Sequence, residues 1–343
     1  MKALLLSEPG KLGMADMPVP EISDEDILVR VRACGICGSD VHGYDGSSGR
    51  RIPPLVMGHE AAGVVERAGA GVKEFEPGDR VTFDSTVYCG RCDFCRRGEV
   101  NLCDNRMVLG VSCGDYRRHG AFAEYVAIPA RIACKLPDQI PFEHAAVIEA
   151  LSVAVHAVGR KAPAPDDTVL VIGCGMIGLL VIQVLRARGA RRIAAVDVDA
   201  NRRAMAQRAG ATWTFDGNDP RLLDSVRSLT EGRGADVALE AVGRTETVQA
   251  AIRGVRKGGT VIVIGNLAPR VELPLQELVT REISLLGSCA SSGEYPACID
   301  LMARGAVDVA PLISVTAPLE EGPAWFERLH RGREPLMKVI LQP

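Results

Sequence analysis

Apolar positions follow two different patterns along the chain, and the pattern changes near residue 142. Before that point, short apolar stretches such as 27–31 and 61–65 are separated by Gly and Pro turns, which predicts β-strands. A helical spacing then covers 142–160, and the Pro-Ala-Pro sequence at 163–165 ends it. The first part of the chain is therefore predicted to be mostly β and to end in a helix.

From Thr168 onward, strand and helix patterns alternate. Strands are predicted at 169–172, 193–196, 237–240, 260–264 and 283–287, and helices at 176–188, 200–209 and 246–255. This order is typical of a parallel, doubly wound sheet. The tail, from about 290 to 343, is predicted to hold one helix near 294–304 and to end in the apolar stretch 338–341.

The composition fits an ordinary globular protein with more than one domain. The chain has 343 residues, 47% hydrophobic and 24% charged, and a single core rarely grows past about 250–300 residues. A net charge of −3 gives no electrostatic basis for binding nucleic acid or an anionic membrane. No apolar run has the roughly 18–20 residues of a membrane span, and the first apolar stretch is too short for a signal peptide.

Cysteine usage adds a first chemical prediction. The chain has 11 cysteines, an odd number, and without an export signal we expect the reducing cytoplasm, where clustered thiols hold metal. Four thiols lie close together, at Cys89, Cys92, Cys95 and Cys103. Four thiolates with no open position suit a structural Zn²⁺, with an iron–sulfur cluster as the chemical competitor.

A glycine-rich turn follows the predicted strand 169–172 and has the sequence Gly173-Cys174-Gly175-Met176-Ile177-Gly178. In such a turn the first glycine allows the tight bend, the second lets a pyrophosphate approach, and the third lets the helix pack on the strand. The pyrophosphate would then lie at the helix N-terminus. The alternative is an α/β domain with a glycine-rich first turn and no nucleotide.

Asp197 ends the second predicted strand and bears on the choice of cofactor. A carboxylate there accepts hydrogen bonds from ribose hydroxyls and repels a 2′-phosphate. Arg202 and Arg203 follow, and either is placed to receive that phosphate. Because the repulsion of a 2′-phosphate by ionised Asp197 should outweigh its attraction by the arginines, NAD is favoured over NADP.

A second group of candidate metal ligands is dispersed along the chain, at Cys37, His59, Glu60 and Glu149. Taken singly, each has an ordinary structural alternative. Cys37 fits a small buried residue, His59 a core imidazole, and Glu149 an acid on a helix surface.

Together these motifs resemble the zinc-containing medium-chain alcohol and polyol dehydrogenases, in particular the sorbitol (L-iditol) and L-threonine 3-dehydrogenase branches. The resemblance covers essentially the whole chain and rests on residues 35–42, 58–60, 148–153 and 173–178, the four cysteines and Asp197. It implies an α/β fold with a GroES-like, mostly β catalytic domain (1–155, with a zinc lobe at about 86–106), a Rossmann NAD-binding domain (156–290), and a C-terminal segment (291–343) that returns to the catalytic domain.

The same resemblance implies roles for individual residues. Cys37 and His59 bind a catalytic zinc, Glu149 falls where the sorbitol branch has a carboxylate, and Glu60 lies beside the metal. Ser39 and His42 match a proton relay, and Cys89, Cys92, Cys95 and Cys103 match a structural zinc lobe. The implied enzyme has two zinc ions per chain, moves hydride from an alcohol to the nicotinamide, and forms homotetramers or homodimers.

The substrate is where the chain departs from these branches. Sorbitol dehydrogenases have an arginine that reaches the substrate hydroxyls, and the corresponding position in this chain, within 287–295, falls at about Ala290. Other polar contacts to substrate are predicted from Tyr44, Asp45, Tyr116, Arg117, Arg118 and His119. We predict a secondary alcohol with neighbouring hydroxyl or amino groups, such as a polyol, cyclitol or sugar derivative. The alternatives are a dehydrogenase of simple alcohols or L-threonine, a zinc-free quinone or enoyl reductase, against which the metal ligands argue, and a non-catalytic nucleotide-binding protein.

Overall fold

The protein divides into two compact units. The computed structural model describes residues 1–113, 116–332 and 334–343, without the side chains of 113, 116 and 117. The first unit comprises residues 1–149, 292–303 and 308–343, and the second comprises 150–291 and 304–307. The sequence placed the two main boundaries after residues 155 and 290, so the observed divisions fall six residues earlier and one residue later, respectively.

The first unit is built mainly of short strands. They are β1 (Lys2–Glu8), β2 (Lys11–Asp16), β3 (Asp26–Gly35), β4 (Leu55–Val56), β5 (Glu60–Ala68), β6 (Arg80–Phe83), β7 (Thr86–Val87), β8 (Met107–Val108), β9 (Ser112–Cys113), β10 (Tyr116–Arg117), β11 (Tyr125–Pro129), β12 (Ala133–Lys135), β19 (Ile313–Pro318) and β20 (Lys338–Gln342). Its helices are α1 (Gly38–Tyr44), α2 (Asp93–Arg96), α3 (Phe142–Ala145), α10 (Tyr295–Ala303) and α11 (Gly322–Arg331).

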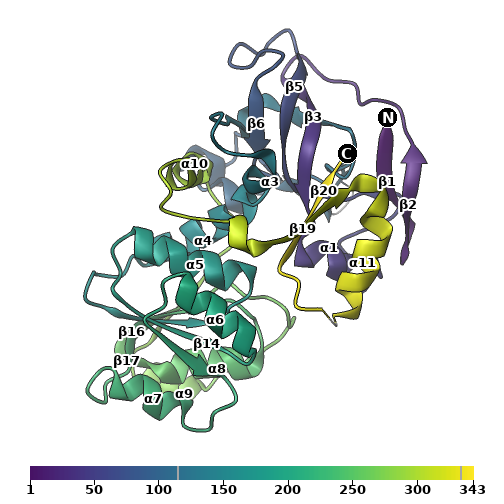
Figure 1. The fold of residues 1–343 in the computed structure, drawn as a ribbon. Helices are drawn as coiled ribbons and strands as arrows, with labels where there is room; N and C mark the ends of the chain where they lie inside the picture. Colours follow the sequence, from purple (N-terminus) through teal and green to yellow (C-terminus); the bar gives the residue numbers. More distant parts are fainter. Residues whose placement is uncertain (114–115, 333) are drawn as a thin grey trace. The chain divides into compact units, whose positions relative to one another are not determined.

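A seven-stranded sheet organises this unit. Its order is β12-β6-β5-β3-β20-β19, with β11 pairing the other part of β3 (Figure 1). The last strand, β20, lies antiparallel to β3, with Ile340 opposite Gly35 and Leu341 opposite Cys34. The C-terminal residues thereby meet the strand that leads into Cys37, and Cys34 itself is completely buried in the core.

Two helical predictions for this part of the chain were wrong. The tail holds a second helix, α11, in addition to the predicted one near 294–304, which is α10. Trp325, Phe326 and Leu329 have the i, i+1, i+4 spacing of one helix face and pack into the core of the first unit, so the signal was present in the sequence. The single helix predicted over 142–160 is two helices, α3 and α4 (Ile148–Arg160).

The second unit alternates strands and helices as the sequence indicated. After α4 its elements are β13 (Thr168–Ile172), α5 (Met176–Ala187), β14 (Arg192–Asp197), α6 (Ala200–Arg208), β15 (Trp213–Asp216), α7 (Leu222–Ser228), β16 (Ala235–Glu240), α8 (Thr245–Gly254), β17 (Val255–Val263), α9 (Leu275–Thr280) and β18 (Ser284–Gly287). Three short elements, β15, α7 and α9, were not predicted from the sequence.

All neighbouring strands of this second sheet are parallel, in the order β15-β14-β13-β16-β17-β18 (Figure 1). The chain moves outward from β13 to β15 and then returns to β16 to build the other half. Right-handed crossovers in opposite directions place the connecting helices on opposite faces. The reversal between β13 and β16 is where sheets of this kind bind ligands, at the carboxyl ends of the strands. Among the described residues, no helix is both long and apolar enough to cross a membrane.

The glycine-rich turn lies at that end of β13, and its three glycines differ in what surrounds them. Gly173 has a φ of +90°, which an L side chain rarely adopts. A Cβ atom at Gly178 would lie 1.8 Å from the carbonyl oxygen of Gly173, so α5 can pack on the turn only without a side chain there. A Cβ atom at Gly175 would meet nothing within 4 Å.

This difference predicts opposite behaviour for two similar substitutions. Gly178→Ala forces two backbone segments apart, and overpacking of this kind costs about 1–3 kcal/mol or more. In a chain of this size, that corresponds to a fall in the melting temperature of the cofactor-free protein of at least roughly 2–4 °C. Gly175→Ala is the matched control and should melt like the wild type. Equal melting temperatures for the two variants would contradict the packing role of Gly178.

Candidate metal centres and nucleotide site

Cys37 lies where β3 gives way to α1. It is the N-cap of that helix, and its Sγ accepts from the backbone N of Ser39 at 3.4 Å and from Ser39 Oγ at 3.2 Å. The carboxylate of Asp40 in turn accepts from the backbone N of Cys37 at 3.3 Å. Donors in the first turn of α1 therefore hold this sulfur in place.

His59 and Glu60 reach the same place because of strand register. Glu60 opens β5 and stands opposite Gly35 of β3. A Cβ atom at position 35 would lie 2.4 Å from Glu60 Oε2, so Gly35 leaves the room that the carboxylate occupies. Ligand atoms of Cys37, His59 and Glu60 all lie within 4.8 Å of one another. Thiolate, imidazole and carboxylate together form a donor set that suits zinc.

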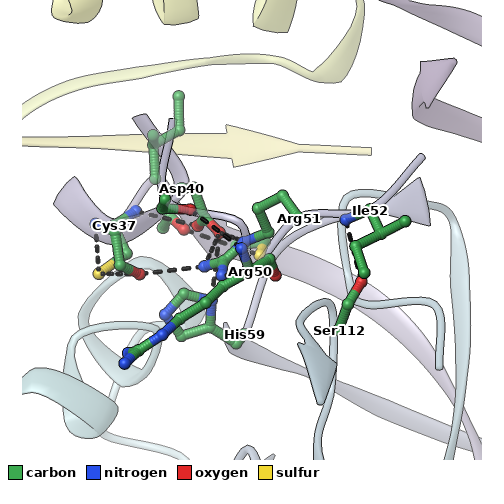
Figure 2. A network of polar contacts seen from close by, with 12 residues as sticks. Cys37, Asp40, Arg50, Arg51, Ile52, His59 and Ser112 are labelled. Atoms are coloured by element: carbon green, nitrogen blue, oxygen red, sulfur yellow. Dashed lines mark hydrogen bonds and ion pairs between the residues drawn. The ribbon is translucent and has the colours of Figure 1, made fainter. Parts of the chain in front are cut away.

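A buried carboxylate that the sequence analysis missed connects two of these residues. Asp40 is completely buried, and its Oδ1 lies 3.4 Å from His59 Nδ1 (Figure 2). Arg51 donates to the same Oδ1 through Nε at 3.2 Å and Nη2 at 2.8 Å. Burial alone would raise the pKa of Asp40, but His59 and Arg51 outweigh it and hold that pKa well below its usual range. With Nδ1 facing Asp40, the Nε2 atom of His59 is the one oriented for a metal.

Glu60 is paired with a second residue that the sequence analysis missed. Lys338, from β20, places its Nζ 2.6 Å from Glu60 Oε2 and 3.1 Å from the carbonyl oxygen of Ile36, and both side chains of the pair are buried. Burial lowers the pKa of Lys338, but Glu60 raises it more, so the ammonium stays charged. No linear motif marks Lys338, which lies 278 residues from its partner.

Glu149 lies in the first turn of α4 and is not in the group of three close ligand atoms. Burial raises the pKa of its carboxyl to about 7; His59 opposes that rise and Glu60 adds to it. The carboxyl is therefore within electrostatic reach of the other candidates. A bound dication would favour its ionised form.

Ser39 and His42 occupy the exposed side of α1. They are three residues apart, which places them on one face of a helix. Ser39 Oγ lies between Cys37 Sγ and Arg51 Nη2, at 3.2 and 3.1 Å. His42 is exposed to solvent, one turn further along.

The four-cysteine segment folds into a compact loop around α2. The Sγ atoms of Cys89, Cys92, Cys95 and Cys103 all lie within 4.8 Å of one another. Backbone N–H groups of Arg91 and Cys92 lower the pKa of the Cys89 thiol to about 6, which prepares it to bind metal as a thiolate. Such a donor set is complete for a four-coordinate zinc.

Two arginines close to this cluster in the sequence pair with neighbouring acids. Arg96 pairs with Asp93 at 2.6 Å, and Arg97 pairs with Glu99 at 2.9 Å. The loop is anchored elsewhere: Ser292 Oγ donates to the carbonyl oxygen of Gly98 at 2.7 Å and accepts from the backbone N of Val100 at 3.1 Å. Ser292 opens the returning segment of the first unit.

The nucleotide candidates lie at the carboxyl ends of β13 and β14. Helix α5 begins at Met176, immediately before Ile177, and no side chain caps its N-terminus at Gly175. Free N–H groups of the first turn and the open space beside Gly175 suit a pyrophosphate. The turn therefore suits the pyrophosphate of a dinucleotide.

Asp197 has a structural task besides its predicted cofactor contact. Its Oδ2 accepts from the backbone N of Cys174 at 2.7 Å, and its Oδ1 accepts from the backbone N of Asp199 at 2.9 Å. Arg203 donates to the carbonyl oxygens of Asp197 and Val198 at 2.8 and 3.0 Å and pairs with an acid of β15. Arg202 is exposed, which leaves it as the better candidate for a phosphate contact.

Most of the polar residues predicted to contact substrate form hydrogen bonds with other residues of the first unit. Tyr44 Oη donates to the carbonyl oxygen of Gly10 at 2.7 Å, and Asp45 accepts from the backbone N of Ser47 at 2.9 Å. Arg118 donates to the carbonyl oxygen of Ala127 at 2.8 Å, and His119 Nδ1 accepts from the backbone N of Val56 at 3.1 Å. The side chains of Tyr116 and Arg117 lie outside the described residues.

Comparison with known proteins agrees with this architecture. Residues 23–138 match the model of the alcohol dehydrogenase GroES-like domain, and residues 177–304 match that of the zinc-binding dehydrogenases. The chain is 33% identical to sorbitol dehydrogenase of Bacillus subtilis over 348 residues, covering all of this chain and 97% of that one. It is 35% identical to D-xylulose reductase A of Aspergillus oryzae, covering 94% of this chain and 92% of that one.

A solved structure extends the likeness to three dimensions. The zinc-binding dehydrogenase of Sinorhizobium meliloti, bound to NADP, has a TM-score of 0.90 and 33% identity, covering all of this chain and 99% of that one. The chain thus belongs to the family of zinc-binding alcohol dehydrogenases. It is an alcohol or polyol dehydrogenase that works with zinc and a nicotinamide cofactor.

The cysteine loop yields a prediction about stability. Cys95→Ser removes one of four thiolates, so we expect the purified protein to lose about one zinc per chain. We expect a destabilisation of about 2 kcal/mol or more, because metal binding to such a loop is also folding free energy. This corresponds to roughly 4–8 °C in melting temperature. Cys289→Ser, at an exposed cysteine of the second unit, is the control. Unchanged zinc content and melting temperature in Cys95→Ser would refute a structural metal in the loop.

Proposed function

We propose that this protein oxidises a secondary alcohol that carries neighbouring hydroxyl groups, such as a polyol, cyclitol or sugar derivative, and passes the hydride to NAD⁺. The observation that carries the proposal is the cluster of Cys37, His59 and Glu60, oriented by buried charged partners. The substrate class is supported by the names of the relatives, a sorbitol dehydrogenase and a D-xylulose reductase.

We assign two zinc ions to each chain. Cys37 and His59 are proposed as ligands of the catalytic ion, with Glu149 and Glu60 as carboxylates that can join them. Cys89, Cys92, Cys95 and Cys103 are proposed to hold the structural ion. A catalytic zinc supplies the positive charge that stabilises an alkoxide, and a nicotinamide supplies the hydride acceptor.

The protein's own residues then perform three tasks. Asp40 holds the ring of His59 in one orientation, and Lys338 compensates the charge of Glu60. Ser39 is proposed to accept the proton of the substrate hydroxyl while it passes its own proton on. His42 is proposed as the exposed end of this relay.

Cofactor binding is proposed at the glycine-rich turn and at Asp197 and Arg202. The turn receives the pyrophosphate on the N-terminus of α5. The carboxylate of Asp197 favours the unphosphorylated ribose of NAD over that of NADP.

We also propose a homodimer or homotetramer in the cytoplasm. In the described part of the second unit, β18 ends the sheet and pairs with β17, and Leu273, Leu275 and Val279 are exposed in the segment before it. An edge strand beside exposed apolar side chains favours pairing with a second copy. The metal sites need reduced thiols, which the cytoplasm maintains. The net charge favours neither nucleic acid nor an anionic membrane as a partner.

The substrate proposal is tested by comparing alcohols of matched size with NAD⁺ as the oxidant. Polyols and cyclitols should give a kcat/KM at least about 100-fold above that of monofunctional alcohols, because a site that hydrogen-bonds hydroxyls rejects analogues that lack them. Substrates include sorbitol, for which we expect weak activity, L-threonine and 2-propanol. If 2-propanol were the best substrate, the protein would be a dehydrogenase of simple alcohols; if L-threonine were, an amino-alcohol dehydrogenase.

The catalytic zinc assignment is tested by Cys37→Ala and His59→Ala. Each should reduce the zinc content from about two ions to one per chain and abolish turnover. Both should retain the wild-type circular dichroism, because the second unit and the cysteine loop do not use these residues. A variant with both zinc ions and the wild-type rate would exclude that residue as a ligand.

Cofactor preference is tested at Asp197 and Arg202. The wild type should bind NAD⁺ more tightly than NADP⁺. Asp197→Ser should reduce the ratio of these two affinities by weakening NAD⁺ binding. It should also loosen the turn, because the carboxylate holds the N–H groups of Cys174 and Asp199.

In the Asp197→Ser protein, adding Arg202→Ala should weaken NADP⁺ binding by about 1.5–3 kcal/mol, the contribution of a charge-assisted hydrogen bond. Arg208→Ala, at the far end of the same helix, is the control. A wild type that prefers NADP⁺ would contradict the assignment.

A further inference from the structure

Arg51 is a buried arginine whose position is fixed by the fold. Its side chain is 3% exposed. The stem packs directly on α1, since a Cβ atom at Gly43 would lie 2.2 Å from Arg51 Cγ. On the other side, Ser112 accepts from the backbone N of Ile52 and donates its own backbone N to the carbonyl oxygen of Arg50, each at 3.0 Å (Figure 2). The guanidinium therefore has little freedom to move.

This guanidinium contacts both sides of the proposed catalytic centre. Nε and Nη2 donate to Asp40 Oδ1, which faces the imidazole of His59. Nη2 also donates to Ser39 Oγ at 3.1 Å. Figure 2 shows the side chain of Arg51 beside Asp40, which lies in the turn of α1 that Cys37 caps. The histidine side and the hydroxyl side of the centre thus share one cation.

We propose that Arg51 is a positioning residue for the reaction: it fixes the His59 ring through Asp40 and the hydroxyl direction of Ser39 through Nη2. The proposal rests on the function proposed above, in which His59 binds the metal and Ser39 carries the proton.

The contact with Asp40 secures the histidine. A buried carboxylate without a partner is costly and would seek other donors. Because Arg51 donates twice to Oδ1, this oxygen stays in place opposite His59 Nδ1. Groups that orient a ligand in this way typically contribute roughly 10- to 100-fold to metal affinity or activity.

The contact with Ser39 sets the direction of proton movement. A hydroxyl has two acceptor positions and one donor, whereas arginine only donates. Arg51 fills one acceptor position of Ser39 Oγ, which leaves the other for the substrate hydroxyl. The O–H of Ser39 donates to Cys37 Sγ in this structure, and in the proposed reaction it turns from the sulfur to the relay. When the substrate proton forms its bond to Oγ, the original O–H bond breaks and that proton passes along the relay, so Ser39 is neutral before and after.

The shape of the side chain matters as well as its charge. Nε and Nη2 of a planar guanidinium reach Asp40 and Ser39 at the same time, whereas a lysine ammonium is a single point charge. Arg51→Lys therefore keeps the charge and loses the simultaneous contact, and Arg51→Gln loses both. Arg50→Gln is the matched control, because it removes one positive charge from the neighbouring, exposed side chain and retains its backbone contacts.

The first measurement needs no turnover: the rate at which a chelator removes zinc from the cofactor-free protein. We expect Arg51→Lys and Arg51→Gln to release the zinc ion that Cys37→Ala lacks roughly 10- to 100-fold sooner than the wild type does. Arg50→Gln should release it like the wild type. Equal release from all three variants and the wild type would overturn the action of Arg51 through Asp40 and His59.

The second measurement is a double-mutant cycle on kcat. Arg51→Lys should lower kcat about tenfold or more with little change in the KM for NAD⁺, and this effect should shrink in a Ser39→Ala background, because both changes act on one proton path. Its effect on zinc release should persist in that background. Full additivity with Ser39→Ala would overturn the action through Ser39.

Two outcomes separate this inference from the function itself. A wild type that holds no zinc or oxidises no alcohol would disprove the proposed function before any variant is made. Arg51 variants that lose their circular dichroism, while Arg50→Gln keeps it, would assign Arg51 to the fold and overturn its role as a positioning residue.

Discussion

The carboxylate of Asp40 is the constraint on which the first metal centre depends. Removing an ion from water costs several kcal/mol unless partners compensate it. Asp40 is completely buried, and its compensation comes from Arg51, from the ring of His59 and from the backbone N–H of Cys37. Because Asp40 lies in the first turn of the helix that Cys37 caps, a single carboxylate fixes the backbone of one proposed ligand and the side chain of another.

The pair of Lys338 and Glu60 ties the C-terminus of the chain to the same centre. Buried ion pairs are poor stabilisers, because desolvation offsets much of their attraction, yet removing one partner leaves a costly charge. The pairing of β20 with β3 is what brings Lys338 to Glu60. This gives a physical reason why the chain returns to the first sheet at its C-terminal end: the last strand supplies the cation that pairs with Glu60.

Much of the fold could be predicted from the sequence where the relevant interactions are local. The turn at Gly173–Gly178 and the four cysteines are contiguous motifs, and the strand–helix alternation after Thr168 is carried by neighbouring residues. Asp40 and Arg51 were missed because their roles arise from burial, and a lone acid and arginine in a polar stretch indicate a surface. Lys338 was missed because strand register, not spacing, brings it to Glu60.

Asp197 shows why cofactor choice in this protein is not a matter of charge alone. The same carboxylate that would distinguish a ribose hydroxyl from a phosphate holds the N–H group of Cys174, the residue between the first two glycines of the turn. It also holds the N–H of Asp199, which caps α6, the helix that carries Arg202. Replacing the carboxylate therefore alters the repulsion, the pyrophosphate cradle and the placement of the candidate phosphate ligand together. A change of cofactor preference requires a substitute that removes the charge but still accepts both backbone hydrogen bonds.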